Sequence, residues 1–298
     1  MKILVTGSKG QLGHELLIQG NNLGYAILPA DLPELDITDK TQVKHWLEKF
    51  QPSLVVNAAA YTNVDKAETE HNLAFAVNRD GPANLAEACA KFEIPLIHIS
   101  TDFIFDGKKR SPYIETDPVY PLSIYGKSKQ EGENEVRSRL KKHIILRTAW
   151  LYGIHGQNFV KTMLRLGREK EVISVVADQF GSPTSAADLT DAVLQIISRI
   201  KKYNGDINWG TYHYCGIGIT TWHGFAKEII SLARQYISIK TITVKPISTA
   251  EYPTKATRPC FSALDCKLIK KNFGISIKPW QDSLKTVIRQ LCQKETEK

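Results

Sequence analysis

Short apolar runs alternate with segments of helical period through the first half of the chain. The apolar runs, nearly continuous and so typical of strands buried on both faces, cover residues 2–6, 25–30, 54–58, 94–100 and 144–148. Apolar side chains at helical spacing predict helices at residues 11–19, 41–50, 66–91 and 125–139. This alternation predicts an α/β fold with a doubly wound parallel sheet.

The alternation ends after Trp150. Segments become shorter, and prolines interrupt the chain at Pro183, Pro253 and Pro259. We therefore expect residues 1–150 to form the sheet domain, and residues 151–298 to form mainly a smaller mixed α/β lobe, with some segments returning to the first domain. Because no linker rich in Gly, Ser or Pro separates the two parts, we expect them to share a tight interface.

Composition is ordinary for a globular protein, at 42% hydrophobic and 9% aromatic residues over 298 positions. The apolar run before Gly7 is too short for a signal peptide or a membrane span, and no later run approaches that length. The expected location is cytoplasmic, without a membrane partner.

The cysteines and histidines form no recognisable metal or redox motif. No Cys-x-x-Cys pair and no His-x-x-x-His set occurs, which argues against zinc ribbons and dithiol redox centres. We expect reduced structural thiols in a cytoplasmic protein. The five cysteines are Cys89, Cys215, Cys260, Cys266 and Cys292.

The net charge of +8 comes mostly from the last fifth of the chain, where residues 240–298 hold twelve Lys or Arg against five Asp or Glu. Aromatic and basic residues are not interleaved there, so no nucleic-acid partner is expected. A pocket for an anionic diphosphate and a solvated basic face remain as alternatives. Arg258, just before a proline, suits two diphosphate oxygens, although a surface arginine is the simpler interpretation.

Three glycines, Gly7, Gly10 and Gly13, follow the first predicted strand and open the first predicted helix. Glycines allow the sharp turn and let backbone N–H groups approach a pyrophosphate at the helix N-terminus. This context indicates a dinucleotide cofactor. The fold class is then a Rossmann-type doubly wound parallel sheet that binds NAD(P), joined to a smaller mixed α/β C-terminal lobe that binds the substrate.

Asp31 ends the second predicted strand, where a carboxylate can accept hydrogen bonds from an adenosine ribose. A carboxylate repels a 2′-phosphate, which favours NADH over NADPH, but Lys9 in the glycine turn can pair with that phosphate. A solvated strand end is the alternative for Asp31. The small residues 58–60 let a flat cofactor lie along the third strand, although tight packing explains them equally well.

Tyr125 and Lys129 stand four residues apart, so a helix places the phenol and the ammonium on one face. We expect the charge of Lys129 to lower the pKa of the phenol, which suits proton transfer near neutral pH. Thr101 follows the fourth predicted strand, at the sheet edge where open α/β sheets bind ligands. Alone it is a turn or cap residue; with Tyr125 and Lys129 it completes a set that indicates a reductase.

These motifs resemble the extended short-chain dehydrogenase/reductases, which act on nucleotide sugars. Further stretches narrow the resemblance to the dTDP-4-dehydrorhamnose reductase family: Asn57–Glu68, Ser100–Gly107, Tyr125–Lys129, Arg147–Gly153, Asn158–Met163, Asp178–Thr184 and Arg258–Pro259. The resemblance spans residues from about 3 to 290. It implies reduction of the C4 keto group of dTDP-4-dehydro-L-rhamnose by NADPH or NADH, the last step of dTDP-rhamnose synthesis for cell-surface polysaccharide.

The resemblance also implies roles for single residues. Tyr125 donates the proton, Lys129 binds the nicotinamide ribose, Thr101 and Asp102 contact the sugar, and Trp150 stacks near it. The cofactor is lined, besides Tyr125 and Lys129, by Gly7, Gly10, Gln11, Leu12, Gly13, Asp31, Asp36, Ile37, Ala60, Tyr61 and Thr62.

Some members of the family hold magnesium at a dimer contact through a glutamate of the first helix. Glu15 occupies that place here, but the second acidic position falls near Ala187 and Asp188. We therefore assign no metal ligand, and magnesium and a homodimer stay open.

Two other activities remain as alternatives. A nucleotide-sugar 4-epimerase shares the Tyr125 and Lys129 pattern but keeps NAD bound and returns the hydride to the same sugar. A non-catalytic relative, such as the regulatory subunit of methionine adenosyltransferase, binds without turnover. Residues 100–103 differ from those of epimerases, and the intact Tyr125–Lys129 pair favours an enzyme over a binding subunit.

Overall fold

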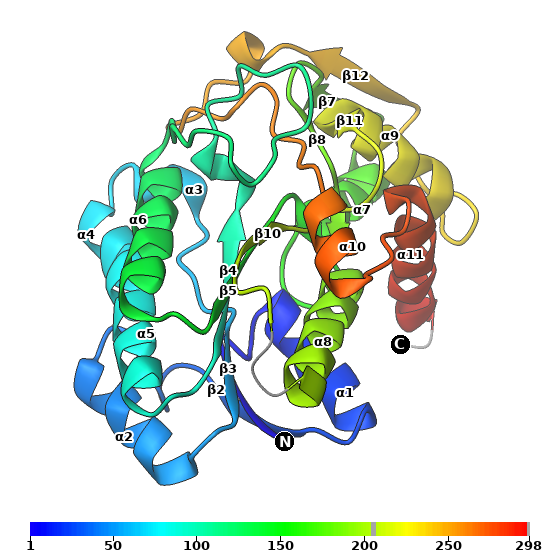
Figure 1. The fold of residues 1–298 in the computed structure, drawn as a ribbon. Helices are drawn as coiled ribbons and strands as arrows, with labels where there is room; N and C mark the ends of the chain where they lie inside the picture. Colours follow the sequence, from blue (N-terminus) through cyan, green and yellow to red (C-terminus); the bar gives the residue numbers. More distant parts are fainter. Residues whose placement is uncertain (204–206, 297–298) are drawn as a thin grey trace.

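The computed structural model describes residues 1–203 and 207–296 (Figure 1). Its central sheet has the strand order β10–β5–β4–β3–β1–β2, and all neighbouring strands are parallel. The strands are β1 (Lys2–Thr6), β2 (Ala26–Ala30), β3 (Leu54–Asn57), β4 (Leu96–Thr101), β5 (His143–Thr148) and β10 (Gly210–His213). The predicted doubly wound parallel α/β sheet is confirmed.

Helices cover both faces of this sheet, as Figure 1 shows. Successive side chains of β1 pack on opposite faces of the sheet: Ile3 and Val5 belong to one apolar cluster and Leu4 to the other. The first cluster contains residues of α1 (Gln11–Asn22), α8 (Ala186–Tyr203) and α10 (Lys267–Phe273). The second contains residues of α2 (Lys40–Phe50), α5 (Gly81–Lys91) and α6 (Ile124–Arg139).

The predicted helical stretch over residues 66–91 is helical except at residues 68–70. The segment holds α3 (Val64–Ala67), α4 (His71–Phe75), the π-helical η1 (Ala76–Asp80) and α5. Pro82 lies in the first turn of α5 and has no N–H for the carbonyl of Asn78, four residues earlier. The Asn78 side chain instead bonds the backbone N–H and C=O of Tyr61, at 2.9 and 3.0 Å. The π-helical turn therefore places the Asn78 side chain against the loop after β3.

The rest of the second half packs around an apolar cluster of its own, which includes Tyr152, Val160, Phe225 and Leu284. Its strands pair as β6–β9, β7–β12 and β8–β11. The elements are β6 (Leu151–Tyr152), α7 (Phe159–Glu169), β7 (Val172–Val176), β8 (Phe180–Gly181), β9 (Thr184–Ser185), β11 (Thr220–Thr221), α9 (Trp222–Ala233), β12 (Thr243–Ile247), η3 (Thr249–Glu251) and α11 (Trp280–Thr296). Residues after 150 thus supply this cluster and also α8, β10 and α10 beside the sheet.

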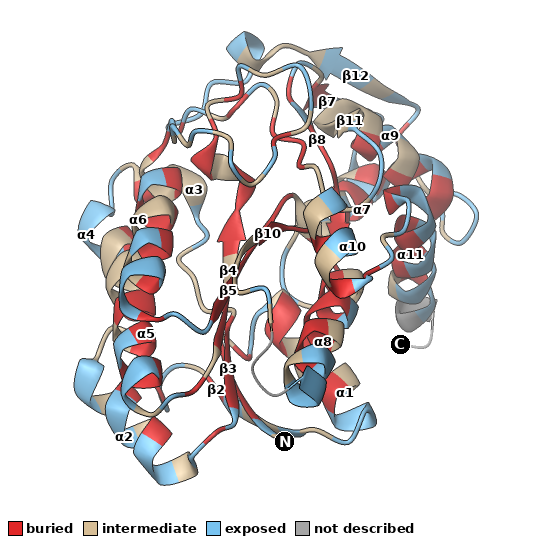
Figure 2. Ribbon diagram, viewed as in Figure 1, coloured by how far each residue is buried: buried red, intermediate tan, exposed pale blue. Residues whose placement is uncertain are grey.

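Burial follows these layers. Figure 2 shows the inner strands of the sheet buried over most of their length, with exposed residues on the outer sides of the flanking helices. The edge strand β2 is buried only at Ala30. Within residues 1–203 and 207–296, the structure contains no helix with both the length and the apolar character that crossing a membrane requires.

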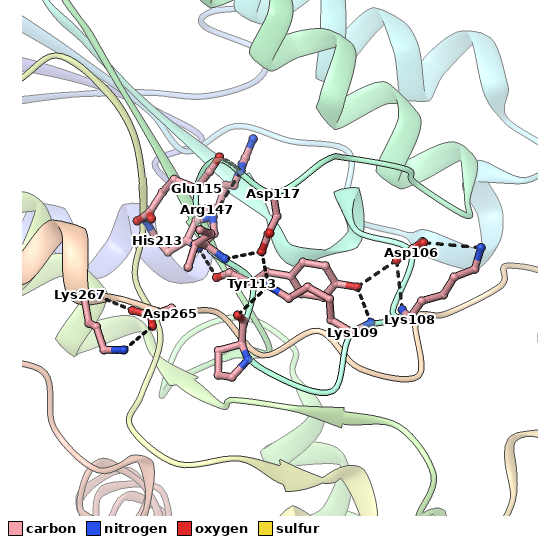
Figure 3. Close-up of polar contacts among 12 residues, drawn as sticks. Asp106, Lys108, Lys109, Tyr113, Glu115, Asp117, Arg147, His213, Asp265 and Lys267 are labelled. Carbon is pink, nitrogen blue, oxygen red and sulfur yellow. Dashed lines mark hydrogen bonds and ion pairs between the residues drawn. The ribbon is translucent and has the colours of Figure 1, made fainter.

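A buried polar network fixes the edge of the sheet at β10 (Figure 3). His213, which is fully buried, places Nδ1 3.0 Å from the carbonyl oxygen of Tyr113 and Nε2 3.3 Å from Nη1 of Arg147. Because a guanidinium group only donates, Nε2 accepts, and Nδ1 carries the proton that it donates to Tyr113. The geometry therefore requires a neutral imidazole.

The neutral state of His213 makes stability depend on pH. Burial, with the nearby Arg147 charge, lowers the pKa of His213 to about 3. A histidine in the unfolded chain has a pKa near 6.5. Between about pH 6.5 and 3, this histidine is therefore protonated in the unfolded chain and neutral in the folded one. The neutral His213 therefore stabilises the fold fully above about pH 6.5. Between pH 7 and 5 its contribution to the free energy of unfolding falls by roughly 2 kcal/mol. Urea unfolding of wild type and His213→Gln at both pH values checks this; equal pH dependence contradicts it.

Candidate active site

A pocket with a cavity volume of about 970 Å³ lies at the carboxyl edge of the sheet. Its wall is formed by the glycine loop, the ends of β2 to β5 and residues from the second half of the chain. Every residue to which the sequence analysis assigned a catalytic, cofactor or substrate role lines it: Gly7, Gly10, Gln11, Leu12, Gly13, Asp31, Asp36, Ile37, Ala60, Tyr61, Thr62, Thr101, Asp102, Tyr125, Lys129, Trp150 and Arg258.

The glycine loop packs against neighbouring backbone too closely to admit side chains at Gly7 and Gly13. Gly7 has a φ of +68°, and a Cβ at that position would lie 2.5 Å from the backbone nitrogen of Ala59. A Cβ on Gly13 would overlap the carbonyl oxygen of Gly7. Gly10 caps α1 without a side-chain hydrogen bond, so the first amides of the helix are available to an anion. This cradle fits a dinucleotide pyrophosphate.

Asp31 joins the end of β2 to the glycine loop. Its carboxylate accepts hydrogen bonds from the backbone N–H groups of Lys9 and Leu32, both at 2.8 Å. The Lys9 ammonium binds the carbonyl of Leu32 and pairs with Glu34 at 3.4 Å. Asp31 therefore shapes the cofactor end of the pocket through two backbone contacts, and Lys9 stands beside it with a positive charge.

Tyr125 and Lys129 lie in the first two turns of α6. Ser123 caps this helix by accepting from the N–H of Gly126, and the absence of a side chain on Gly126 lets α6 approach the carbonyl of Phe103. The Tyr125 phenol is hydrogen-bonded to the Thr101 hydroxyl. Lys129 is almost fully buried, and its Nζ donates to the carbonyl of Ile99 at 2.6 Å. The predicted hydroxyl–phenol–ammonium set thus comes together in one place.

The expectation that Lys129 lowers the pKa of Tyr125 is wrong. Burial raises the pKa of Tyr125 to about 12, against a smaller opposite effect of the Thr101 hydrogen bond. Burial also lowers the pKa of Lys129 to about 8, partly opposed by the charge of Glu133. The Lys129 ammonium is directed to the Ile99 carbonyl, and desolvation of the phenol outweighs a charge that is not in contact with it. At neutral pH the phenol is therefore protonated.

Behind Lys129, a buried carboxylate is paired with two arginines. Glu133, one turn further along α6, accepts from Nε and Nη2 of Arg147 at 2.9 and 2.8 Å. Arg137 of the same helix donates to the carboxylate from the other side at 2.5 Å. Burial alone raises the pKa of Glu133, but the two arginines outweigh it and lower the pKa to about 2. Glu133 is thus ionised at neutral pH and is a buried charge one helical turn beyond Lys129.

At the other end of the pocket, two indoles stack face to face. Trp150 and Trp222 have ring centroids 3.6 Å apart and planes within 7° of parallel. Trp150 adopts a φ of +46°, a strained conformation for a bulky side chain, and Phe159 lies 4.7 Å from the Trp222 ring. One face of Trp150 is therefore covered by Trp222.

Arg258 reaches the pocket from the C-terminal segment and is held by an ion pair. Its Nη2 lies 2.7 Å from the carboxylate of Asp65, which also accepts from the N–H of Ala256 at 3.1 Å. The guanidinium lowers the pKa of Asp65. Asp65 thus holds a basic residue of the second half of the chain beside the loop that follows β3.

Comparison with known proteins shows the family of this chain. A family model described as the RmlD substrate binding domain matches residues 1–293. The chain belongs to the RmlD family. The family predicted from the motifs is thereby confirmed.

Three relatives of this RmlD-family chain cover almost its whole length. A dTDP-4-dehydrorhamnose reductase of Aggregatibacter actinomycetemcomitans is 43% identical over 288 residues, 96% of this chain and 98% of that protein. The crystal structure of a dTDP-4-dehydrorhamnose reductase from Clostridium acetobutylicum is 42% identical, with a TM-score of 0.91 and coverage of 98% and 99%. That of the Bacillus anthracis reductase, in complex with NADP, is 39% identical, with a TM-score of 0.89 and coverage of 97% and 99%.

Several pocket residues of this RmlD-family chain escaped the sequence analysis. Trp222 begins α9 and lines the pocket, but nothing in its local sequence indicates a site. Asn158 caps α7 and donates to Oε1 of Gln11 at 3.0 Å, so it joins the second half of the chain to the glycine loop. The Asn158–Met163 stretch contributed to the resemblance without indicating this role.

The magnesium positions do not form a ligand set in this RmlD-family chain. Glu15 accepts from the side-chain amide of Gln19, and Asp188 binds Lys278 and Ser283. In the part of the chain that the structure describes, no group of three or more His, Cys, Asp or Glu side chains is placed to hold a metal.

Proposed function

We propose that this chain reduces the C4 keto group of dTDP-4-dehydro-L-rhamnose with NADPH or NADH and so forms dTDP-L-rhamnose. The observation that carries the proposal is the position of Tyr125, Thr101 and Lys129, between the glycine cradle and the Trp150 end of one pocket. The names of the three relatives support the substrate, and the NADP complex of the Bacillus anthracis reductase supports the cofactor.

The chain's own residues supply the proton side of this reaction. The reduced nicotinamide, when bound, provides the hydride. Tyr125 holds a proton on its phenol oxygen at neutral pH because burial raises its pKa to about 12. Thr101 orients that phenol by a hydrogen bond, and Tyr125 gives the proton to the oxygen that was the C4 carbonyl. Lys129, buried and directed to the carbonyl of Ile99 at the end of β4, is one helical turn from Tyr125, where its ammonium can bind the nicotinamide ribose.

Asp102 differs from an ordinary surface carboxylate in this pocket. Burial raises its pKa to about 6, against hydrogen bonds from Ser262 and Thr101 that act in the opposite direction. One of its oxygens accepts from the Thr101 hydroxyl at 3.1 Å. We propose that Asp102 binds a sugar hydroxyl beside the reacting carbon, with Thr101 fixed between Asp102 and the phenol.

We expect Asp31→Ala to shift the cofactor preference toward NADPH. The substitution removes a carboxylate that repels a 2′-phosphate and leaves the Lys9 charge in place. The ratio of kcat/KM for NADPH to that for NADH, measured before and after the change, is the test. Glu48→Ala is the control, because it removes an exposed carboxylate that pairs with Lys44 on α2 and does not line the pocket. An unchanged ratio for Asp31→Ala means that Asp31 only holds the backbone of Lys9 and Leu32 and does not set the cofactor preference.

We expect Trp150→Ala and Arg258→Ala to weaken the binding of dTDP and to leave NADPH binding within a few-fold. Trp150 offers an aromatic edge with one donor, and the Arg258 fork matches two diphosphate oxygens. Calorimetric titration of each variant with dTDP and, separately, with NADPH gives the result. Arg165→Ala is the control, because that arginine is exposed and pairs with Glu169 on α7. Selective loss of NADPH binding places these residues at the wrong end of the pocket.

One assay separates the proposed reaction from its alternatives. The purified protein is mixed with NADPH and a dTDP-4-dehydro sugar, and both the cofactor and the sugar products are followed. Net oxidation of NADPH with formation of the C4 alcohol supports the reductase. Interconversion of two sugar epimers without net oxidation shows an epimerase. Binding of dTDP and NADPH without turnover shows a non-catalytic relative, and either of these results rejects the proposal.

We also propose that the protein works in the cytoplasm. All five cysteines carry free thiols in the structure, as is usual for proteins kept reduced in that compartment.

A further inference from the structure

Two of the cysteines, 51 positions apart in sequence, touch each other below the substrate end of the pocket. Cys215 follows β10 and is 3% exposed, and Cys266 stands at the start of α10, where it is partly exposed. Their Sγ atoms are 3.6 Å apart, and the N–H of Cys215 donates to the Sγ of Cys266 at 3.3 Å. The two sulfur atoms are thus held in van der Waals contact by the backbone around them.

The contact changes the acidity of the pair. Either sulfur can donate in this contact, and a hydrogen bond from Cys266 lowers the pKa of Cys215 despite its burial. A thiolate is the form that reacts with oxidants, and a second sulfur in contact can then displace the oxidised group. Cys89 shows the opposite case, because burial in the apolar core raises its pKa. Cys260 is exposed, and it offers a reactive surface thiol for comparison.

The segments joined by this contact also hold the loop that carries the catalytic groups. Cys215 packs in one apolar cluster with Ile104 and Phe105, which follow Asp102, and with Ala149, which precedes Trp150. The same segments hold Tyr113: Asp265 donates its N–H to the Tyr113 carbonyl at 2.8 Å, and His213 bonds the same oxygen (Figure 3). A disulfide requires the sulfur atoms at about 2.05 Å, so closing this bond from 3.6 Å rotates at least one of the two side chains and changes its packing against these segments.

We propose that Cys215 and Cys266 form a reversible disulfide when the protein meets a peroxide, and that this bond lowers turnover in the adjoining pocket. The Cys215 thiolate attacks hydrogen peroxide and becomes a sulfenic acid, and the hydroxide that leaves takes up a proton to form water. The Cys266 sulfur then attacks the Cys215 sulfur, and the sulfenic oxygen leaves as a second water with the Cys266 proton. Two thiols are oxidised and one peroxide is reduced to two waters. A dithiol reductant reverses the reaction.

The covalent part of this proposal is independent of the proposed function, whereas the effect on turnover rests on it. The full-length protein is treated with hydrogen peroxide, unfolded, and alkylated with N-ethylmaleimide. We expect two fewer alkylated cysteines than in the reduced protein, and a peptide pair that joins Cys215 to Cys266. We expect turnover to fall roughly 10-fold or more and to return with dithiothreitol, because misplacing reacting groups by about 1 Å is this costly.

Matched variants identify the pair. We expect Cys266→Ala and Cys215→Ser each to keep full alkylation of their remaining cysteines after peroxide. We also expect their turnover to fall less with peroxide than that of the wild type. Cys260→Ser, which removes the exposed thiol, is expected to behave as wild type. Full alkylation of the wild type, or a bond that includes Cys260, overturns the disulfide. A Cys215–Cys266 bond with unchanged turnover overturns the switch. If the reduced protein shows no turnover at all, the proposed function fails, and the alkylation count still decides the disulfide.

Discussion

Replacing Tyr125 by phenylalanine is expected to lower kcat by about 10²–10⁴-fold while the affinity for NADPH stays within a few-fold. The change removes one oxygen, the atom that bonds Thr101 and holds the proton. The aromatic ring and its edge contact with Phe103, at 5.6 Å between centroids, are kept, so the helix start should pack as before. Steady-state turnover and NADPH titration of the same preparation give the two quantities.

Tyr120→Phe is the matched control for this experiment. Tyr120 is 64% exposed, lies outside the described pocket and stands in the same loop region before α6. We expect it to turn over at the wild-type rate. A Tyr125→Phe enzyme that keeps more than about a tenth of wild-type kcat removes Tyr125 from the role of proton donor.

The cofactor half of the site could be predicted from sequence because its signals are local. Gly7, Gly10 and Gly13 fall within one strand–turn–helix unit, and the φ of +68° at Gly7 is a conformation that only the absence of a Cβ makes easy. Tyr125 and Lys129 are likewise one turn apart on one helix. Because such residues belong to one local element, their separation in the sequence also fixes their positions relative to one another in three dimensions.

The substrate half depended on contacts between distant segments. Arg258 is placed by Asp65, 193 positions earlier, and Trp150 is covered by Trp222 from a different helix. No periodicity indicates either contact, because each depends on how the second half of the chain folds back over the sheet edge. The resemblance supplied Trp150 as a site residue, and neither approach indicated Trp222.

The error in the pKa of Tyr125 has a related cause. The sequence shows that an ammonium lies one helical turn away, but it does not show how deeply the phenol is buried or where Lys129 is directed. In the structure the ammonium donates to Ile99, and desolvation dominates. The sequence likewise did not show the π-helical turn at Ala76–Asp80, where Pro82 supplies no amide and Asn78 contacts Tyr61. Local sequence alone does not determine such competing effects.

The buried pair of Glu133 and Arg147 is the feature most costly to break. Both side chains are almost completely removed from water, at 0% and 3% exposure, and are joined by two hydrogen bonds of 2.9 and 2.8 Å. We expect Glu133→Gln to lower the free energy of unfolding by about 3–5 kcal/mol, because it leaves the Arg147 charge buried without its partner. Arg147→Met should cost less, because Arg137 still donates to the Glu133 carboxylate. Urea unfolding at pH 7 measures both.

The double variant separates the pair from its surroundings. With Glu133→Gln and Arg147→Met together no charge is left unpaired at these two positions, so the loss should be well below the sum of the single losses. Glu135→Gln is the surface control: Glu135 pairs with Arg139 on the same helix at 30% and 41% exposure, and we expect a change under about 1 kcal/mol. Additive single losses would mean that the two residues stabilise the fold separately. A strong coupling would show that β5 and α6 are joined by this pair, directly behind the helix face that presents Lys129 to the pocket.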